Sequence, residues 1–332
     1  MNRRKGLAMI AAAPAAVAAA LFAKPSLGAK NSQSIYLEGE GMPYAAFDAL
    51  PKTAMPVQGG TVNVAFAPGE IALPKEKIME WVGAAAQSVT TYYGRFPVRS
   101  VRLLIVPVDG AGVRGGTTWG YRGAAIRMLL GRDSSAEDLT RDWKMTHEMV
   151  HLALPDMDRR YNWLSEGLAV YIEPIARVQA GFLTAESIWA DVVRDMPKGL
   201  PDAGDAGLDS NGSWASTYWG GARFCLLADI EIRRQTGSRL GLQDAMRGVL
   251  AAGGSHEVDW PIRKILAAAD QAVGLHVLTA QYDRMGSKAV RTDLTALWRD
   301  LGIEASDDGV RFHAEAPLAA ECSAITKKPA SG

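Results

Sequence analysis

The spacing of apolar residues along the chain predicts strands in the first half and helices in the second. Residues 101–108 form an almost continuous apolar run, which is typical of a buried strand. Apolar stretches at 61–66 and 117–130, set between glycine-rich turns, predict two or three further strands. Residues 75–93 repeat apolar side chains at helical spacing and predict a helix.

Helical spacing dominates the rest of the chain. It predicts helices at 137–153, 163–178, 184–195, 216–236, 242–251, 260–273 and 292–301. Strands followed by helices indicate an α+β fold. We expect a small strand-rich N-terminal lobe at 29–136, a mainly helical lobe at 137–303 with a cleft between the two lobes, and a C-terminal tail at 304–332.

The first 28 residues have the pattern of an export signal. Arg3, Arg4 and Lys5 precede an alanine-rich apolar run, and small residues follow it. A transmembrane anchor is the alternative, but Pro14 interrupts the run, which is barely long enough to span a bilayer. We therefore expect a cleaved signal peptide at 1–28, no stable membrane insertion afterwards, and a periplasmic or secreted protein. Sec and twin-arginine export both stay open.

The composition is that of a folded globular protein, with 48% hydrophobic and 22% charged residues. The chain has 36 basic and 36 acidic residues, and removal of residues 1–28 takes away four basic and no acidic ones, which leaves a formal charge of −4. A nucleic-acid partner is therefore not expected. Cys225 and Cys322 are too few for a disulfide scaffold or a multi-cysteine metal cluster. Export would permit a disulfide between them, and two free thiols are equally compatible with the sequence.

Residues 147–151 read His-Glu-Met-Val-His and bring two imidazoles into a metal-binding spacing. On a helix, His147 and His151 lie on one face, one turn apart, so both can reach one metal ion. Glu148 lies beside the same opening, where it can take a proton from metal-bound water. The alternatives are an accidental match on an amphipathic helix and a metalloprotease scaffold that has lost its activity.

A catalytic zinc usually has three protein ligands and one open position, so the two histidines require a third residue. A third histidine at the metzincin spacing is excluded, because Leu154 and Met157 stand where that pattern has glycine and histidine. The acidic candidates downstream are Asp156, Asp158, Glu166 and Glu173.

Glu166 is better placed than the other acids. Asp156 and Asp158 follow the motif too closely to fold back onto the same helix face. Asn162 is a suitable cap for a new helix, and an antiparallel return of that helix brings Glu166 opposite the two histidines. Glu173, seven residues later on the same face, suits either the orientation of a histidine or simple exposure to solvent.

These residues resemble a known family. The motif, followed by Asn-Trp-Leu-Ser-Glu-Gly-Leu-Ala-Val-Tyr-Ile-Glu at 162–173, is similar to the gluzincin metallopeptidases, among them the peptidase MA-like domains and the glycyl aminopeptidase and aminopeptidase N families. The resemblance implies a zincin-like fold, one Zn²⁺ ion held by His147, His151 and Glu166, and Glu148 as the general base.

A second stretch extends the resemblance. Residues 216–224 read Ser-Thr-Tyr-Trp-Gly-Gly-Ala-Arg-Phe and are similar to the helix that follows the active site in both aminopeptidase families. By this resemblance Tyr218 stabilises the oxyanion of the tetrahedral intermediate, as a phenol beside the metal can. An aromatic side chain that lines the cleft or the core is the alternative. Gly220 replaces the lysine that these families carry before the glycine.

Other departures concern the substrate. The Gly-x-Met-Glu-Asn signature of the aminopeptidase N family is absent, and the most similar segment, residues 114–120, has no acidic residue. By resemblance, Gly116, Thr117 and Thr118 belong to an edge strand that pairs with an extended peptide; a glycine-rich hairpin is the alternative. Aminopeptidase specificity is therefore not carried over. Clear resemblance covers about 137–250.

The sequence thus predicts an exported zinc-dependent peptidase that hydrolyses peptide bonds by Glu-assisted attack of zinc-bound water. Its expected partner is a peptide or protein substrate, while the choice between exo- and endopeptidase and the oligomeric state stay open. One alternative is a non-catalytic zinc-binding envelope protein that binds peptides or a protein partner. Another is a metal-free scaffold with the histidines packed in the core.

Overall fold

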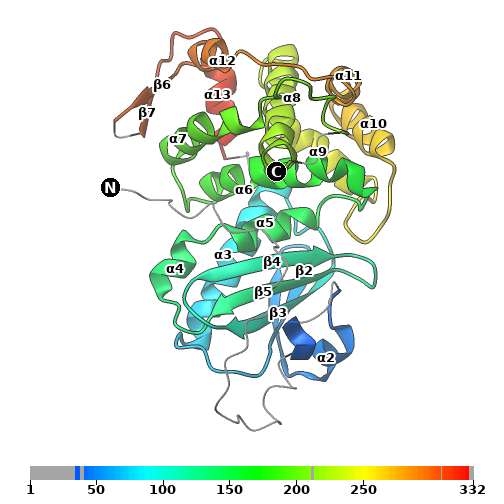
Figure 1. The fold of residues 1–332 in the computed structure, drawn as a ribbon, viewed down its shortest axis with the longest axis vertical. Helices are drawn as coiled ribbons and strands as arrows, with labels where there is room; N and C mark the ends of the chain where they lie inside the picture. Colours follow the sequence, from blue (N-terminus) through cyan, green and yellow to red (C-terminus); the bar gives the residue numbers. More distant parts are fainter. Residues whose placement is uncertain (1–33, 38–40, 211–212, 308, 329–332) are drawn as a thin grey trace.

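The computed structural model describes residues 34–37, 41–210, 213–307 and 309–328. The predicted signal peptide, residues 1–28, lies outside the described residues. A five-stranded sheet and a set of helices form a mixed structure (Figure 1), which confirms the expected combination of α and β elements and is compatible with a zincin-like fold. Within this part of the chain, none of the helices combines the length and apolar character needed to cross a membrane.

The sheet has the strand order β1-β2-β3-β5-β4. Its strands are β1 (Lys52–Val57), β2 (Gly60–Phe66), β3 (Ser100–Val108), β4 (Val113–Trp119) and β5 (Ala125–Gly131). The strands β2 and β5 run parallel to β3, whereas β1 and β4 run antiparallel to their neighbours. β4 is therefore an edge strand that pairs with β5 alone, and helix α5 (Lys144–His151) packs against β4.

Alternate residues of β3 face two different layers, as the period of a strand requires. One set joins the main core with helix α3 (Lys75–Tyr93), whose bounds are those predicted. The other set contacts the segment around helix α2 (Tyr44–Ala49). The first set includes Leu103 and Ile105, and the second includes Leu104 and Val106. Both faces of the sheet are thus covered, which agrees with the apolar run of β3.

The remaining helices gather mainly on one side of the sheet, and α5 lies between the sheet and α6 (Figure 1). They are α4 (Ala136–Arg141), α6 (Asn162–Gln179), α7 (Ala185–Asp195), α8 (Gly221–Thr236), α9 (Leu242–Ala251), α10 (Ile262–Val273), α11 (Leu278–Met285), α12 (Leu294–Asp300) and α13 (Ala319–Thr326). Helices α6, α7, α9, α10 and α12 correspond to predicted helices, whereas α2, α11 and α13 were not predicted.

The prediction of one continuous helix at 137–153 is wrong, because the chain breaks between α4 and α5. Asp142 has an extended backbone there, with ψ of 138°. Its carboxylate accepts hydrogen bonds from the backbone N–H groups of Lys144 and Met145 and from the indole of Trp81. A side chain that satisfies the first N–H groups of a helix favours a new start at that point. Helix α5 therefore begins only one turn before the metal-binding motif.

The start of α6 also differs from the prediction. Asn162 does not cap this helix but is its first residue. A 3₁₀ turn, Arg159–Tyr161, leads directly into α6, and the Asp158 side chain caps that turn by accepting from the N–H of Arg160. The chain therefore enters α6 directly from this 3₁₀ turn, without the capping asparagine that the sequence predicted.

Helices α6 and α8 cross at two glycines. A Cβ atom on Gly221 would lie 2.0 Å from the backbone oxygen of Trp163, and one on Gly167 would lie 2.3 Å from the backbone of Gly221. The predicted helix 216–236 begins with a π-helical turn, Ser216–Gly220, just before this crossing. Glu166 directly precedes Gly167, and Tyr218 lies in the turn that precedes Gly221, so the close approach of the two helices brings these two side chains to the same region.

The residues predicted as a C-terminal tail contain regular structure. β6 (Ile303–Ser306) and β7 (Gly309–Phe312) form an antiparallel pair. Helix α13 packs against α6 and α8, with Cys322 and Ile325 buried. Cys322 and Cys225 are both buried free thiols, so the disulfide left open by the sequence is not formed.

Candidate metal centre and active site

Helix α5 presents both imidazoles of the motif from a buried position. His147 is 4% exposed and His151 8% exposed, and their ring centroids lie 4.9 Å apart. Two imidazoles on the same helix face, one turn apart, give this arrangement. Their burial between the sheet and α6 holds the rings in one orientation, which favours metal binding.

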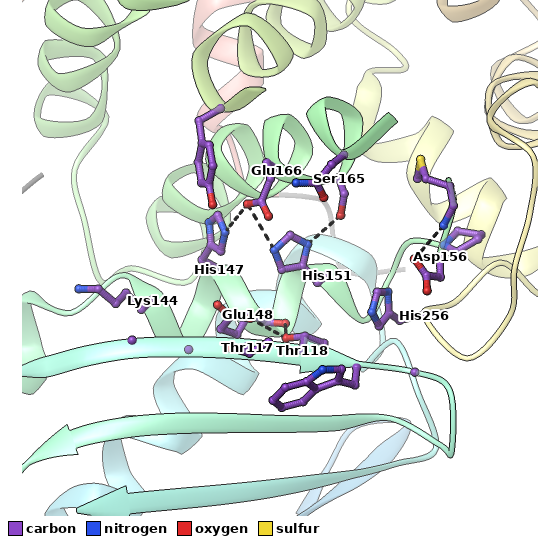
Figure 2. Close-up of a pocket in the computed structure, with 18 of the residues that line it drawn as sticks. Thr117, Thr118, Lys144, His147, Glu148, His151, Asp156, Ser165, Glu166 and His256 are labelled. Atoms are coloured by element: carbon purple, nitrogen blue, oxygen red, sulfur yellow. Dashed lines mark hydrogen bonds and ion pairs between the residues drawn. The ribbon is translucent and has the colours of Figure 1, made fainter. Parts of the chain in front are cut away.

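Glu166 on α6 completes a group of three ligand atoms that all lie within 4.8 Å of one another. Its Oε2 atom lies 3.2 Å from Nε2 of His147 and 3.7 Å from Nε2 of His151 (Figure 2). Ligand atoms around a tetrahedral zinc, at about 2.0–2.1 Å from the metal, lie about 3.3 Å apart. The donor set of two imidazoles and one carboxylate, and its spacing, therefore fit one zinc ion.

Neighbouring groups orient the two imidazoles differently. Nδ1 of His151 lies 3.0 Å from Oγ of Ser165, so this hydroxyl fixes the ring while Nε2 points to Glu166. Nδ1 of His147 is buried and has no hydrogen-bond partner among the described residues. The His147 ring is instead held by Trp143 at 5.3 Å, edge to face, and by Tyr218, whose ring is nearly parallel at 6.3 Å.

Burial changes the protonation of the central groups. It lowers the pKa of His151 to about 3, which keeps the imidazole neutral, as a metal ligand must be. Burial also raises the pKa of Glu148 to about 7, despite the opposing effects of His147 and the Thr118 hydroxyl. A carboxyl group with such a pKa can both accept and release a proton near neutral pH.

The edge strand β4 supports Glu148 from below. The hydroxyl of Thr118 lies 2.7 Å from Oε2 of Glu148 and 2.9 Å from its backbone oxygen, so it donates to this residue. A Cβ atom on Gly116 would lie 2.5 Å from Cγ of Glu148, so only glycine leaves room for the side chain. Two of the three predicted strand residues thus position Glu148, and the third, Thr117, lines the same pocket.

Tyr218 lies on the opposite side of the metal ligands, in the π-helical turn. Its hydroxyl is close enough to the carboxylate of Glu166 for the two groups to influence each other electrostatically, and its ring stacks on Trp214 at 5.0 Å. Burial, and after it the charge of Glu166, raises the pKa of the Tyr218 hydroxyl, which therefore keeps its proton and remains a hydrogen-bond donor. The structure brings this hydroxyl close to the metal ligands, as the predicted role requires.

Glu173 does not lie where either interpretation of the sequence expected it. It is buried, so exposure to solvent is wrong, and its carboxylate forms an ion pair with Arg177 at 2.8 Å. No hydrogen bond joins it to a histidine among the described residues, although its charge acts on His147. Its carboxylate pairs instead with Arg177, on the next turn of α6.

The metal ligands open into a pocket of about 390 Å³. Its walls come from β4, α5, the start of α6, Tyr218 and the segment around His256. The sequence did not predict roles for Ser165 or His256, because neither stands at a ligand spacing from the motif. Ser165 directly precedes Glu166, and this adjacency is the signal in the sequence that could have indicated a role for Ser165.

Comparison with solved structures supports the fold. An aminopeptidase N family protein from Idiomarina loihiensis superposes with a TM-score of 0.58 and 15% sequence identity, over 81% of this chain and 53% of that chain. An M1 zinc metallopeptidase from Deinococcus radiodurans matches with a TM-score of 0.45 and 14% identity, over 70% of this chain and 51% of that chain. This chain therefore spans about half the length of these proteins.

No protein-family model matches the chain, and no curated protein matches it. At 15% identity, the likeness to the Idiomarina loihiensis protein concerns the fold alone. The resemblance inferred from the motifs is confirmed at that level: the chain shares the fold of about half of an aminopeptidase N family protein.

Proposed function

We propose that this protein is an exported zinc-dependent peptidase in which Glu148 assists the attack of water on a peptide bond. The observation that carries the proposal is the convergence of three zinc-type ligand atoms in an open pocket, with the Glu148 carboxylate beside them. Export rests on the pattern of residues 1–28. The pocket then serves as the cleft between a strand-bearing lobe and a helical lobe.

His147, His151 and Glu166 would hold the zinc ion, and the pocket leaves one side of this group open for water and substrate. When bound, zinc supplies Lewis acidity, which makes a water molecule nucleophilic near neutral pH and polarises a carbonyl group. Glu148 accepts the proton of the attacking water and passes it to the nitrogen that leaves.

Tyr218 and β4 supply the remaining groups. The Tyr218 hydroxyl donates a hydrogen bond to the negative charge that develops on the carbonyl oxygen. The free edge of β4 offers backbone N–H and C=O groups to an extended peptide, which holds the scissile bond above Glu148. The substrate is therefore a peptide, or an extended segment of a protein.

The alternative of a non-catalytic zinc-binding protein explains fewer of these contacts. A structural zinc site is closed by four protein ligands and needs no base. Three ligands with an open side, and a buried carboxylate held by Thr118, favour the catalytic function.

The test is the exchange of Glu148 for glutamine, which keeps the shape of the side chain and removes the proton acceptor. We expect Glu148→Gln to bind zinc like the wild type and to lose at least about a hundredfold in kcat on a peptide library. Glu137→Gln, an exposed residue of α4, is the matched control. Full activity of Glu148→Gln would contradict the proposed function.

A further inference from the structure

The pocket above β4 carries opposite charges at its two ends. Arg114 and Lys144 line one end, and Asp156 lines the other, beside His256. Figure 2 shows Lys144 beyond His147 on one side, and His256 and Asp156 beyond His151 on the other. The metal ligands and the proposed base therefore lie between a cationic end and an acidic end.

The two ends can be assigned to the two ends of β4. Glu148 lies over the middle of the strand, against Gly116 and Thr118. A Cβ atom on Gly120 would lie 1.5 Å from the backbone oxygen of His256, so the acidic end meets the carboxyl end of β4. Arg114 belongs to the first residues of the strand, so the cationic end meets its amino end.

The cations are not neutralised by partners of their own. Among the described residues, no carboxylate lies within ion-pair distance of Arg114 or Lys144. The ammonium of Lys144 lies 5.0 Å from the centre of the Trp143 ring. Lys144 also acts electrostatically on Asp142, but the oxygens of that buried carboxylate already accept hydrogen bonds from two backbone N–H groups and an indole.

Asp156 is held in place by its backbone. Its N–H donates to Val258 and its C=O accepts from Trp260, which forms a short bridge to the segment after His256. The side chain accepts only the N–H of the next residue, Met157, and is exposed. In the part of the chain that the structure describes, no cation pairs with it, so its charge is available to a ligand.

The charges select one direction for a bound peptide. A peptide that pairs antiparallel with β4 has its amino terminus at the carboxyl end of the strand and its carboxyl terminus at the amino end. Its terminal ammonium then meets Asp156, and its terminal carboxylate meets Arg114 and Lys144. The parallel direction places like charges together at both ends, which disfavours binding.

We propose that the pocket above β4 is a groove that binds short peptides with free ends. The peptide runs antiparallel to β4, with its carboxylate at Arg114 and Lys144 and its ammonium at Asp156. The inference rests on the proposed function and adds the substrate class to it. From Arg114 to Gly120 the strand spans about 20 Å, at about 3.4 Å per residue. Because the charged side chains line the pocket within this span, peptides of about four to six residues fit, with two or three on each side of the scissile bond.

The experiment compares one hexapeptide in three forms: with free ends, with a C-terminal amide and with an N-terminal acetyl group. We expect each blocked end to lower kcat/KM by roughly three- to tenfold, mainly through KM, since the lost charge contacts lie away from the reacting atoms. Arg114→Gln should weaken the preference for the free carboxylate alone, since Lys144 remains, and Asp156→Asn should abolish the preference for the free ammonium alone. Arg99→Gln, an exposed arginine outside the groove, should change neither.

Binding of the same three peptides to zinc-loaded Glu148→Gln separates this inference from the proposed function. Tighter binding of the free-ended form, without hydrolysis by the wild type, supports the inference and contradicts the peptidase function. Hydrolysis of all three forms with equal kcat/KM overturns the inference and leaves the peptidase function intact. Absence of any peptide binding overturns it as well.

Discussion

At the middle of the groove, His147, Glu148 and His151 are each less than a tenth exposed, and β4, α6 and Tyr218 surround them. At its ends, Arg114 and Asp156 are exposed and meet no oppositely charged side chain among the described residues. Groups that must hold a metal and move a proton need fixed positions in a dry environment. Groups that attract charged ends of a ligand can act from the surface, at the cost of sensitivity to salt.

This contrast predicts that changes in the middle affect metal binding and kcat, whereas changes at the ends affect KM. The predictions below run from the largest expected effect to the smallest.

Removal of the metal should have the largest effect. Dialysis against a chelator should abolish peptide hydrolysis, and added zinc should restore it, because the residues at the centre provide no other electrophile. The thermal unfolding midpoint should also fall, since zinc binds the folded state. Hydrolysis that continues unchanged after complete removal of metal would contradict the claim that the middle of the groove acts through a bound metal.

Tyr218→Phe removes one hydroxyl beside the metal ligands. We expect kcat to fall about a hundredfold with little change in KM, because the lost hydrogen bond forms only with the developing oxyanion. Steady-state kinetics on one peptide measures this. Tyr121→Phe, at the exposed rim of the same pocket, is the control and should retain nearly full kcat.

Gly116→Ala tests the packing of β4 against Glu148. Its Cβ would overlap the Glu148 side chain at 2.5 Å, so we expect kcat to fall about tenfold and stability to fall by about 1–3 kcal/mol. Gly115→Ala is the matched control, because its Cβ would meet only Leu129, at 3.7 Å. Equal behaviour of the two variants in kinetics and denaturant unfolding would contradict the role of Gly116.

Ser165→Ala removes the hydroxyl that orients His151. We expect zinc affinity to fall about tenfold, because partners of metal-ligating histidines tune affinity by this order. Competition with a chromophoric chelator measures it. Ser323→Ala, an exposed serine of α13, should leave the affinity unchanged.

Salt should have the smallest effect, and one limited to the ends of the groove. Raising the ionic strength from about 0.05 to about 0.5 M should raise KM for a free-ended peptide by about threefold and leave kcat constant, because exposed charges are screened. If kcat falls with salt while KM stays constant, the division between middle and ends is wrong.

The sequence predicted the elements with a strong periodic pattern and the residues of the motif. The bounds of α3 were predicted correctly because its apolar face is continuous, and His147, His151 and Glu166 lie together as their spacing required. The break at Asp142 was not predicted, because the side chain is held there partly by a hydrogen bond from Trp81, which is distant in sequence.

Features set by three-dimensional contacts were not predictable. Gly116 was expected to belong to a strand that pairs with substrate, and its role in making room for Glu148 depends on the approach of α5 to β4. His256 lines the pocket because its loop packs on Gly120, more than a hundred residues away in sequence. The burial of Glu173 likewise depends on the elements that pack on α6, among them α3 and α5, whereas its ion pair with Arg177 is local to α6.

The most direct test of the central claim is the zinc content of the purified protein, measured for the wild type and for His151→Ala. The structure predicts one zinc per chain in the wild type and none in His151→Ala, with both variants folded by circular dichroism. A wild-type protein without zinc at saturating metal, or a His151→Ala variant that still binds one zinc with unchanged affinity, would contradict the claim that His147, His151 and Glu166 form the metal centre.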